Sequence, residues 1–209
     1  MKNLIIIGAG GFGREVYNFA LCSKGFGTEF IIKGFLDKDI NALGAFKGYP
    51  QILGSEDNYD IKPNDVFISA IGDEKIRKKS AMMIIEKGGK CIKLIHNTSI
   101  INSNVILGEG CIIEPYAYIG ADTKIGSFTL IQNNAVVGHD VKIGDFTRID
   151  CHVTLVGGIF VGDNVYIHTG AVINHKVVVE DNACVGANSF VIKRVKAGTT
   201  VYGNPARKL

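Results

Sequence analysis

The sequence lacks an excess of charge of either sign. Its 209 residues hold 23 Lys and Arg against 20 Asp and Glu, which gives a formal net charge of +3. A strongly basic or acidic balance would indicate a nucleic acid or a charged surface as the partner. The composition therefore predicts neither a nucleic-acid partner nor a membrane partner.

The sequence also lacks long apolar runs and paired cysteines. No run approaches the roughly 18 apolar residues that span a bilayer. The opening LIIIGAGGFG is interrupted by glycines and has no cleavage-like end, so it predicts a strand and a turn rather than a signal peptide. The five cysteines form no CxxC pair, which favours free thiols in a cytoplasmic protein. The absence of Trp and the scarcity of Pro exclude nothing.

A six-residue repeat is the strongest pattern that is present. From Ile101 onward, sixteen consecutive hexads follow one another without insertion, and every first position is Ile, Leu or Val. The fifth positions are all small or β-branched, and the middle positions are rich in Gly, Asn and Asp. Positions one and five are therefore expected to point inward, while the middle turns a corner. Because only the next coil can cover each apolar face, the pattern predicts a parallel β-helix and not a sandwich.

The residues before the repeat indicate an α/β unit. KNLIII reads as a strand, the glycine run of residues 8–13 as a turn, and the segment from Arg14 to about Cys22 as a helix. Two more strands, FIIKGFLD and DVFISAIG, end near Asp37 and Gly72. Ligands bind at the carboxyl ends of such strands, and a glycine turn before a helix favours phosphate. The candidate substrate-binding residues in the glycine turn and at these strand ends are Gly10, Gly11, Phe12, Asp37, Lys38, Gly72 and Asp73.

The size of this unit limits its ligand. Asp37 follows Gly13 by 24 residues, where an acidic side chain can accept hydrogen bonds from a ribose hydroxyl. A full dinucleotide fold usually needs two βαβαβ halves, and only one is present. A mononucleotide or nucleotide-sugar is therefore favoured over NAD. A tight turn without any ligand remains the alternative, since a single GxGxxG is weak evidence.

Several segments together resemble a known family along the whole chain. They are GAGGFGREV, GFLDKD, AIGDEKIRKK, KLIHNTSII, VVGHDVKIGDF and the final YGNPARKL. Their order resembles the bacterial sugar acyltransferases of the PglD/NeuD type, which modify nucleotide-linked amino sugars or sialic acid. The resemblance implies a left-handed β-helix with three hexads per coil, acetyl-CoA as donor, and a role in surface polysaccharide biosynthesis. It also implies a homotrimer with active sites between subunits and an N-terminal domain that binds the nucleotide.

The resemblance also carries site residues onto this chain. The catalytic His of the family falls on His139, and the acidic residue after it falls on Asp140. Where many members have a His near the thioester, this chain has Arg148. Where some N-acetyltransferases have a His in the glycine loop and an Asn before the catalytic His, it has Phe12 and Gln132. These departures leave the acceptor open between an amine and a hydroxyl.

An 18-residue coil predicts which residues stack on His139. Gly157 falls one coil away and His175 two coils away. Acyl transfer needs a base for the acceptor and a donor for the thioester oxygen. His139 suits the first role, Asp140 can fix its tautomer, and the backbone N–H groups of Gly157 and Gly158 suit the second.

Coenzyme A needs cations for its phosphates. Lys193 and Arg207 belong to a basic C-terminal cluster and are candidate contacts, although a solvated face is the plain alternative. Ala187, one coil beyond Thr169, matches a small residue that lines the pantetheine groove in the family. The predicted coenzyme-binding residues are therefore Arg148, Gly157, Thr169, Ala187, Lys193 and Arg207.

The other histidines, His96, His152 and His168, are interpreted as structural. No metal site is predicted, because zinc needs three or four ligands and the H-x4-H spacing of the β-helix carbonic anhydrases is missing.

The sequence thus predicts a nucleotide-sugar-binding Rossmann-like domain at residues 1–95 and a left-handed β-helix acyltransferase domain at residues 96–209. The favoured function is acetyl-CoA-dependent acetylation of a nucleotide-linked amino sugar, with UDP as the expected nucleotide and His139 as general base. O-acetylation of a sialic-acid-type hydroxyl is the first alternative. A non-catalytic nucleotide-sugar or CoA-binding protein and NAD-dependent redox chemistry are the others.

Overall fold

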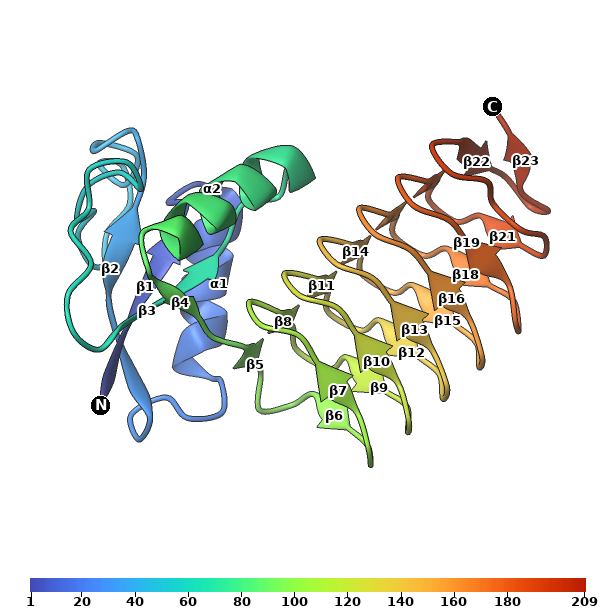
Figure 1. Cartoon of the computed structure of the whole chain (residues 1–209), viewed down its shortest axis with the longest axis horizontal. Helices are drawn as coiled ribbons and strands as arrows, with labels where there is room; N and C mark the ends of the chain where they lie inside the picture. Colours follow the sequence, from blue (N-terminus) through green and yellow to red (C-terminus); the bar gives the residue numbers. More distant parts are fainter. The chain divides into compact units, whose positions relative to one another are not determined.

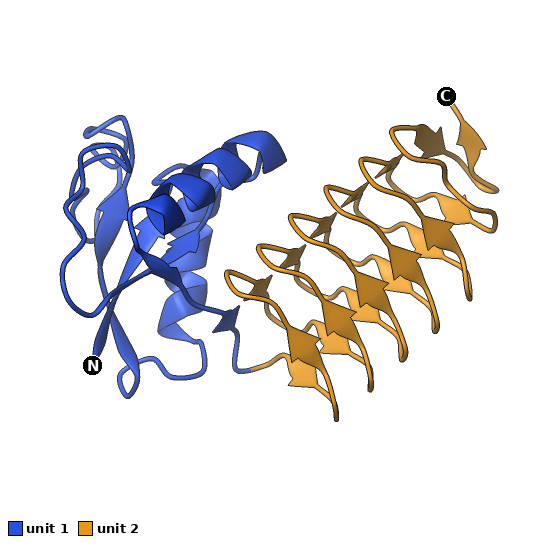
Figure 2. Ribbon diagram, in the orientation of Figure 1, with its two compact units in different colours: residues 1–97 blue, residues 98–209 orange.

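The computed structural model describes residues 1–209, which form two compact units, 1–97 and 98–209 (Figure 1, Figure 2). The division falls two residues beyond the boundary drawn from the sequence.

The second unit is a left-handed parallel β-helix, as predicted. Its strands are only two or three residues long, and successive strands pass in turn to three sheets, here named I, II and III (Figure 1). Sheet I holds β6 (Ile100–Ile101), β9 (Tyr118–Ile119), β12 (Val136–Val137), β15 (Thr154–Leu155), β18 (Val172–Ile173) and β21 (Phe190–Val191). Sheet II holds β7 (Ile106–Leu107), β10 (Lys124–Ile125), β13 (Lys142–Ile143), β16 (Phe160–Val161) and β19 (Val178–Val179). Sheet III includes β8 (Ile112–Ile113), β11 (Leu130–Ile131), β14 (Arg148–Ile149), β17 (Tyr166–Ile167), β20 (Cys184–Val185), β22 (Thr200–Tyr202) and the antiparallel β23 (Arg207–Lys208).

The register between coils is eighteen residues. Leu130 pairs with Arg148, and Arg148 pairs with Tyr166. From the second coil onward, the first and fifth residues of every hexad are buried, as the sequence predicted. The first coil is less covered, and Ile101, Val105 and Leu107 are only half-buried.

The fourth residue of a hexad makes the corner. Fifteen of the sixteen hexads have a positive φ there, between 52° and 73°. Gly, Asn and Asp adopt this conformation at low cost, which explains their frequency in the repeat. Phe128 and Phe146 adopt it as well, and their rings stack with centroids 4.9 Å apart. Ring stacking between coils thus compensates for the less suitable backbone.

The interior also holds threonines at the fifth position. The hydroxyls of Thr123, Thr129 and Thr147 each donate to a glycine carbonyl of the next coil at 2.8 Å. Each hydroxyl also accepts a backbone N–H from that coil, so no polar group is left without a partner. Threonine therefore fits where the repeat otherwise requires a small apolar residue.

The first unit is the predicted Rossmann-like domain. Its elements are β1 (Lys2–Ile7), α1 (Gly11–Leu21), β2 (Phe30–Leu36), β3 (Asp65–Ser69), α2 (Glu74–Glu86), β4 (Lys90–Cys91) and β5 (Leu94–Ile95). The parallel sheet has the order β2-β1-β3-β4, so the direction of winding reverses between β1 and β3. Neither helix is long and apolar enough to cross a membrane.

The last glycine of the GxGxxG motif packs α1 onto the strand before it. A Cβ on Gly13 would lie 1.9 Å from the carbonyl oxygen of Gly8, so no other residue fits without a shift of the backbone. Gly8 itself has a φ of 98°. Residues Leu4 to Ile7 of β1 are fully buried beneath this turn. The glycines are therefore needed for the fold, whether or not the turn also holds a ligand.

A buried carboxylate anchors the long connection between β2 and β3. Asp65 accepts hydrogen bonds from Lys33 Nζ at 2.8 Å, from the Tyr59 hydroxyl at 2.7 Å and from the Lys62 N–H at 2.9 Å. Burial alone would raise the pKa of Asp65, but the bonds from Lys33, Lys62 and Tyr59 outweigh it, so the pKa lies below its usual value. The charged form is thus the one that the fold stabilises.

This linkage predicts an acid-dependent loss of stability. The contribution of Asp65 is present above the pKa of an unfolded Asp, about 3.9, and is lost as the pH falls through the lower folded pKa. Asp65→Asn should lower the melting temperature at pH 7, and the difference from wild type should shrink below about pH 4. Thermal melts between pH 3 and pH 8 measure it. Asp60→Asn, at an exposed ion pair with 3.7 Å between the charged atoms, is the matched control and should change little. A constant difference at all pH values would contradict the assignment.

Candidate functional site

His139 and Asp140 lie side by side at the corner between sheets I and II, after β12 and before β13. Nδ1 of the imidazole is 2.6 Å from Oδ2 of Asp140, and both side chains are 65% exposed in the single chain. A carboxylate only accepts hydrogen bonds, so Nδ1 carries the proton. In the neutral imidazole Nε2 then keeps its lone pair, which is the form that a general base requires.

Gly157 lies directly against this imidazole, one coil further on. A Cβ on Gly157 would be 2.5 Å from Nε2 of His139, so the imidazole can occupy this position only because residue 157 has no side chain. The Gly158 N–H is used within the solenoid, where it donates to the His139 carbonyl at 2.9 Å. The Gly157 N–H donates to no protein group. Of the two donors expected from the sequence, only Gly157 is therefore available.

The same corner continues toward the C-terminus. His139, Gly157, His175 and Lys193 follow one another at intervals of eighteen residues. With an inter-strand spacing of roughly 4.8 Å, Lys193 lies about 14 Å from His139 along the solenoid. The edge of the β-helix between sheets I and II therefore has a candidate base near its middle and a cation near its C-terminal end.

A basic hollow of about 450 Å³ surrounds that end. Its lining includes Lys193, Arg207, Lys196 and Lys208 together with valines of the last coils. Arg194 also lines it and pairs with Glu180, whose pKa is lowered by the hydrogen bond from the Ala197 N–H and by Arg194. The structure thus brings Lys193 and Arg207 together, as the sequence suggested.

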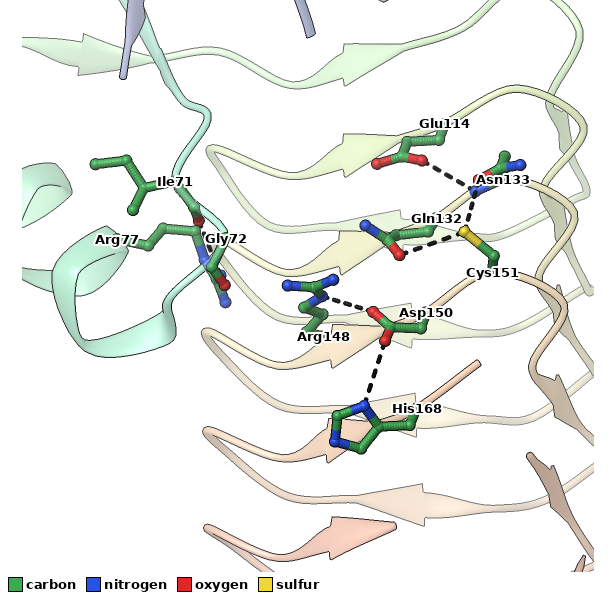
Figure 3. A network of polar contacts seen from close by, with 10 residues as sticks. All are labelled: Ile71, Gly72, Arg77, Glu114, Gln132, Asn133, Arg148, Asp150, Cys151 and His168. Carbon is green, nitrogen blue, oxygen red and sulfur yellow. Dashed lines mark hydrogen bonds and ion pairs between the residues drawn. The ribbon is translucent and has the colours of Figure 1, made fainter. Parts of the chain in front are cut away.

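Arg148 does not lie at this corner. It belongs to β14 in sheet III, where its Nε donates to Asp150 at 2.6 Å and its guanidinium lies 4.7 Å from the centre of the Tyr166 ring. Asp150 also lies 3.7 Å from Nδ1 of His168 (Figure 3), and the ring of His168 stacks on the ring of Tyr166. Within one chain, Arg148 is therefore part of a polar network on another face from His139.

The corner between sheets III and I holds the remaining polar positions. The thiol of Cys151 lies 2.8 Å from Oδ1 of Asn133 and 3.5 Å from Oε1 of Gln132 (Figure 3). Burial raises the pKa of Cys151, and the nearby carboxylates of Glu114 and Asp150 add to the effect. Thr169 and Ala187, predicted to contact the coenzyme, are exposed along this same corner and not along that of His139.

The N-terminal unit contains a cavity of about 550 Å³ at the carboxyl ends of β1, β2 and β3. Its lining includes six of the predicted residues: Gly10, Gly11, Phe12, Asp37, Lys38 and Gly72. Asp37 accepts the Ala9 N–H at 2.8 Å and so holds the glycine turn against the end of β2. Asp73 is not part of the lining, because its side chain caps α2 and accepts the Ile76 N–H at 2.9 Å.

Sequence reasoning missed other residues around this cavity. Glu56, Lys79 and Ser80 line it, although nothing in their local sequence indicates a site. Arg77 stands among exposed lysines in the sequence, but its own side chain is fully buried and donates to the carbonyls of Ile71 and Gly72 at 3.2 Å. It therefore fixes the loop that forms one wall of the cavity (Figure 3).

No group of three or more His, Cys, Asp or Glu side chains in the structure is arranged to hold a metal ion.

Comparison with known proteins matches both units. Residues 3–84 match the PglD N-terminal domain, and residues 122–157 and 158–193 match the hexapeptide repeats of bacterial transferases. The chain joins a PglD N-terminal domain to bacterial-transferase hexapeptide repeats. The order of the two parts is the one that the sequence motifs indicated.

Individual relatives agree with this assignment. The PglB acetyltransferase domain of Neisseria gonorrhoeae FA1090, solved with acetyl coenzyme A, has a TM-score of 0.91 and 28% identity over 100% of this chain and 99% of that one. PerB of Caulobacter crescentus, solved with CoA and GDP-perosamine, has a TM-score of 0.86 and 25% identity over 100% and 98%. GDP-perosamine N-acetyltransferase of Escherichia coli O157:H7 is 30% identical over 129 residues, 57% of this chain. That match spans 54% of the relative, about half of its length.

The contact between Gly157 and His139 predicts a paired effect. Gly157→Ala places a methyl carbon 2.5 Å from Nε2, so it should displace the imidazole and lower the melting temperature by a few degrees. In the double variant with His139→Ala the obstacle is gone, and stability should return to that of His139→Ala alone. Thermal melts of the four proteins give the coupling. Additive effects of the two substitutions would show that the methyl group does not meet the ring.

Proposed function

We propose that the protein is an acetyl-CoA-dependent acetyltransferase that acts on the amino group of a nucleotide-linked sugar, with His139 as general base. The observation that carries the proposal is the arrangement at the corner between sheets I and II. The imidazole has Nδ1 held by Asp140, Nε2 available, and the unused N–H of Gly157 beside it. Relatives of the same architecture have been solved with acetyl coenzyme A and with CoA.

The chemistry follows from these positions. As the sugar amine attacks the thioester carbonyl, Nε2 of His139 takes the proton that the amine loses. Asp140 stabilises the imidazolium that forms. The carbonyl oxygen becomes negative in the tetrahedral intermediate, and in this proposal the Gly157 N–H donates to it. The C–S bond then breaks, and the CoA sulfur leaves as a thiolate that takes the proton back from Nε2 of His139, which restores the neutral imidazole.

The coenzyme fits along the His139–Lys193 edge. With the thioester at His139, the pantetheine chain extends past Gly157 and His175 toward the C-terminal coils. The phosphates then reach the basic hollow, where Lys193 and Arg207 supply the positive charge. In this placement the coenzyme does not contact Thr169, Ala187 or Arg148 of the same chain. These three residues lie on other parts of the solenoid.

A second copy of the chain completes the site in this proposal. His139 is 65% exposed in the single chain, whereas acyl transfer is favoured in a site from which water is excluded. We infer a homotrimer in which a neighbouring solenoid covers the corner. The residues predicted to contact the coenzyme but placed away from His139 are then candidates to approach the site of the neighbouring subunit. Light scattering of the purified protein measures the mass of the assembly.

The base assignment predicts a large effect on turnover. His139→Asn should lower kcat by about 10²- to 10⁴-fold while the KM for acetyl-CoA changes little. The assay follows CoA release with 4-amino sugars linked to GDP and to UDP, beside sugars that offer only hydroxyls. His152→Asn, at another exposed corner position of the solenoid, is the control and should remain active. Full activity of His139→Asn would eliminate the base, and acetylation of the hydroxyl sugars alone would change the acceptor.

The coenzyme path predicts a separate effect on binding. Lys193→Ala and Arg207→Ala should each raise the KM for acetyl-CoA by about five- to tenfold and leave kcat within about twofold, since they act on phosphates away from the reacting atoms. The increase should diminish in high salt because exposed charges are screened. Lys142→Ala, an exposed lysine of sheet II, is the control. Equal KM values for all four proteins would place the phosphates elsewhere.

A further inference from the structure

Glu56 is a buried carboxylate in the wall of the N-terminal cavity. Its residue is 5% exposed. Oε1 accepts a hydrogen bond from the hydroxyl of Ser80 at 2.7 Å. Oε2 is buried as well and has no hydrogen-bond partner. Glu56 and Ser80 both line the cavity, so the carboxylate belongs to its wall.

The loop that carries Glu56 is fixed by two anchors. The ammonium group of Lys87 donates to the carbonyls of Glu56, Asp57 and Tyr59 at 3.0, 3.0 and 2.7 Å. On the other side, the carbonyl of Gly54 accepts the Asp37 N–H at 2.9 Å. Glu56 is therefore held in position and its carboxylate does not depend on a flexible loop.

An unsatisfied carboxylate oxygen in a buried position is costly to the fold. Leaving a buried acceptor without a donor costs on the order of 1–3 kcal/mol, and more for a charged group. Such groups in native proteins call for a specific explanation. Ser80 donates only to Oε1 of the carboxylate, so the cavity favours a ligand that brings a hydrogen-bond donor to Oε2.

The rest of the lining suits a nucleotide. Gly10 and Gly11 stand at the N-terminus of α1, where phosphate is favoured, and Lys38 and Lys79 add positive charge. Leu36, Ile76 and Met83 supply apolar surface for a flat ring. Phosphate and ring thus have separate places, and Glu56 is left to contact the polar edge of the base.

We propose that Glu56 recognises a guanine base, whose N1–H and N2–H donate side by side to the two carboxylate oxygens. Oε1 has a second lone pair beside the one that Ser80 uses, so both bonds are possible together. This inference rests on the proposed function in that a nucleotide-linked sugar occupies the cavity. It differs from the expectation of a uridine nucleotide that the sequence favoured.

The other bases fit Glu56 less well. Uracil presents one N–H between two carbonyl oxygens, which the carboxylate would repel. Adenine and cytosine present an amino group beside a ring nitrogen that only accepts. Guanine is the one common base with two adjacent donors on this edge, and hydrogen bonds that involve a charged partner are about twice as strong as neutral ones.

Calorimetry on the full chain with GDP, IDP and UDP tests the proposal without acetyl transfer. GDP should bind at least about tenfold tighter than UDP, since the charged pair is worth at least about 1.4 kcal/mol. IDP lacks the N2 amino group and keeps N1–H, so it should lie between them. Equal or tighter binding of UDP, equal binding of GDP and IDP, or no binding of any of the three would overturn the assignment.

The variant Glu56→Gln gives a second and sharper test. Its amide offers one donor and one acceptor, which disfavours guanine and suits the N–H and carbonyl of uracil. The ratio of GDP to UDP affinity should therefore fall by about tenfold or more and can reverse. Asp57→Asn, one residue away and exposed, is the matched control and should keep the wild-type ratio. An unchanged ratio in folded Glu56→Gln would remove Glu56 from base recognition.

The two proposals fail in different ways. Acetylation of UDP-linked amino sugars together with weak GDP binding would overturn the guanine assignment and keep the acetyltransferase. Tight, Glu56-dependent GDP binding without transfer to any acceptor would keep the assignment and overturn the acetyltransferase. If Glu56→Gln does not fold, as a thermal melt would show, the comparison of GDP with IDP on the wild-type protein still decides.

Discussion

The stacking of each residue on the one eighteen positions later is the constraint on which the solenoid depends. Strands of two residues have too few hydrogen bonds to persist alone, so each coil is stable only against its neighbours. Stacking also turns a spacing in the sequence into a distance in space. Residues at the same corner of successive coils line up in a column along the solenoid, and an extended molecule can lie along such a column. The order His139, Gly157, His175, Lys193 is therefore a geometric fact as well as a sequence pattern.

The left-handed corner couples this scaffold to its chemistry. Asp140 occupies a fourth position with a φ of 56°. The repeat favours Asp here for its backbone conformation, and the same position brings its carboxylate within 2.6 Å of Nδ1 of His139. A residue chosen only for the corner, such as Asn or Gly, would leave the tautomer of the imidazole unfixed. Gly157 also serves two purposes. Its lack of a side chain lets the coils approach each other and makes room for the imidazole of His139.

The repeat could be predicted from the sequence because its physics is local. Each hexad carries its own inward and outward residues, and the corner residue follows from backbone preference. Counting by eighteen also predicted that Gly157 lies beside His139, whereas the choice of His139 as the candidate base came from the family resemblance. Arg148 shows where this method stops. The eighteen-residue spacing predicts the sheet to which Arg148 belongs. Its contacts with Asp150 and Tyr166 depend on side-chain directions, which the spacing does not determine.

The N-terminal cavity could be predicted only in part for a different reason. Strand ends and glycines are visible in the sequence, so the residues of the turn and of β2 were found. Glu56 and Ser80 are 24 residues apart, in a loop and a helix that no period relates. Arg77 looks like its exposed neighbours until the helix is packed, and it then proves to hold the Ile71–Gly72 loop from beneath. In this chain the periodic unit fixes distances, and selectivity for the ligand is left to the aperiodic one, where a single buried carboxylate can discriminate among bases.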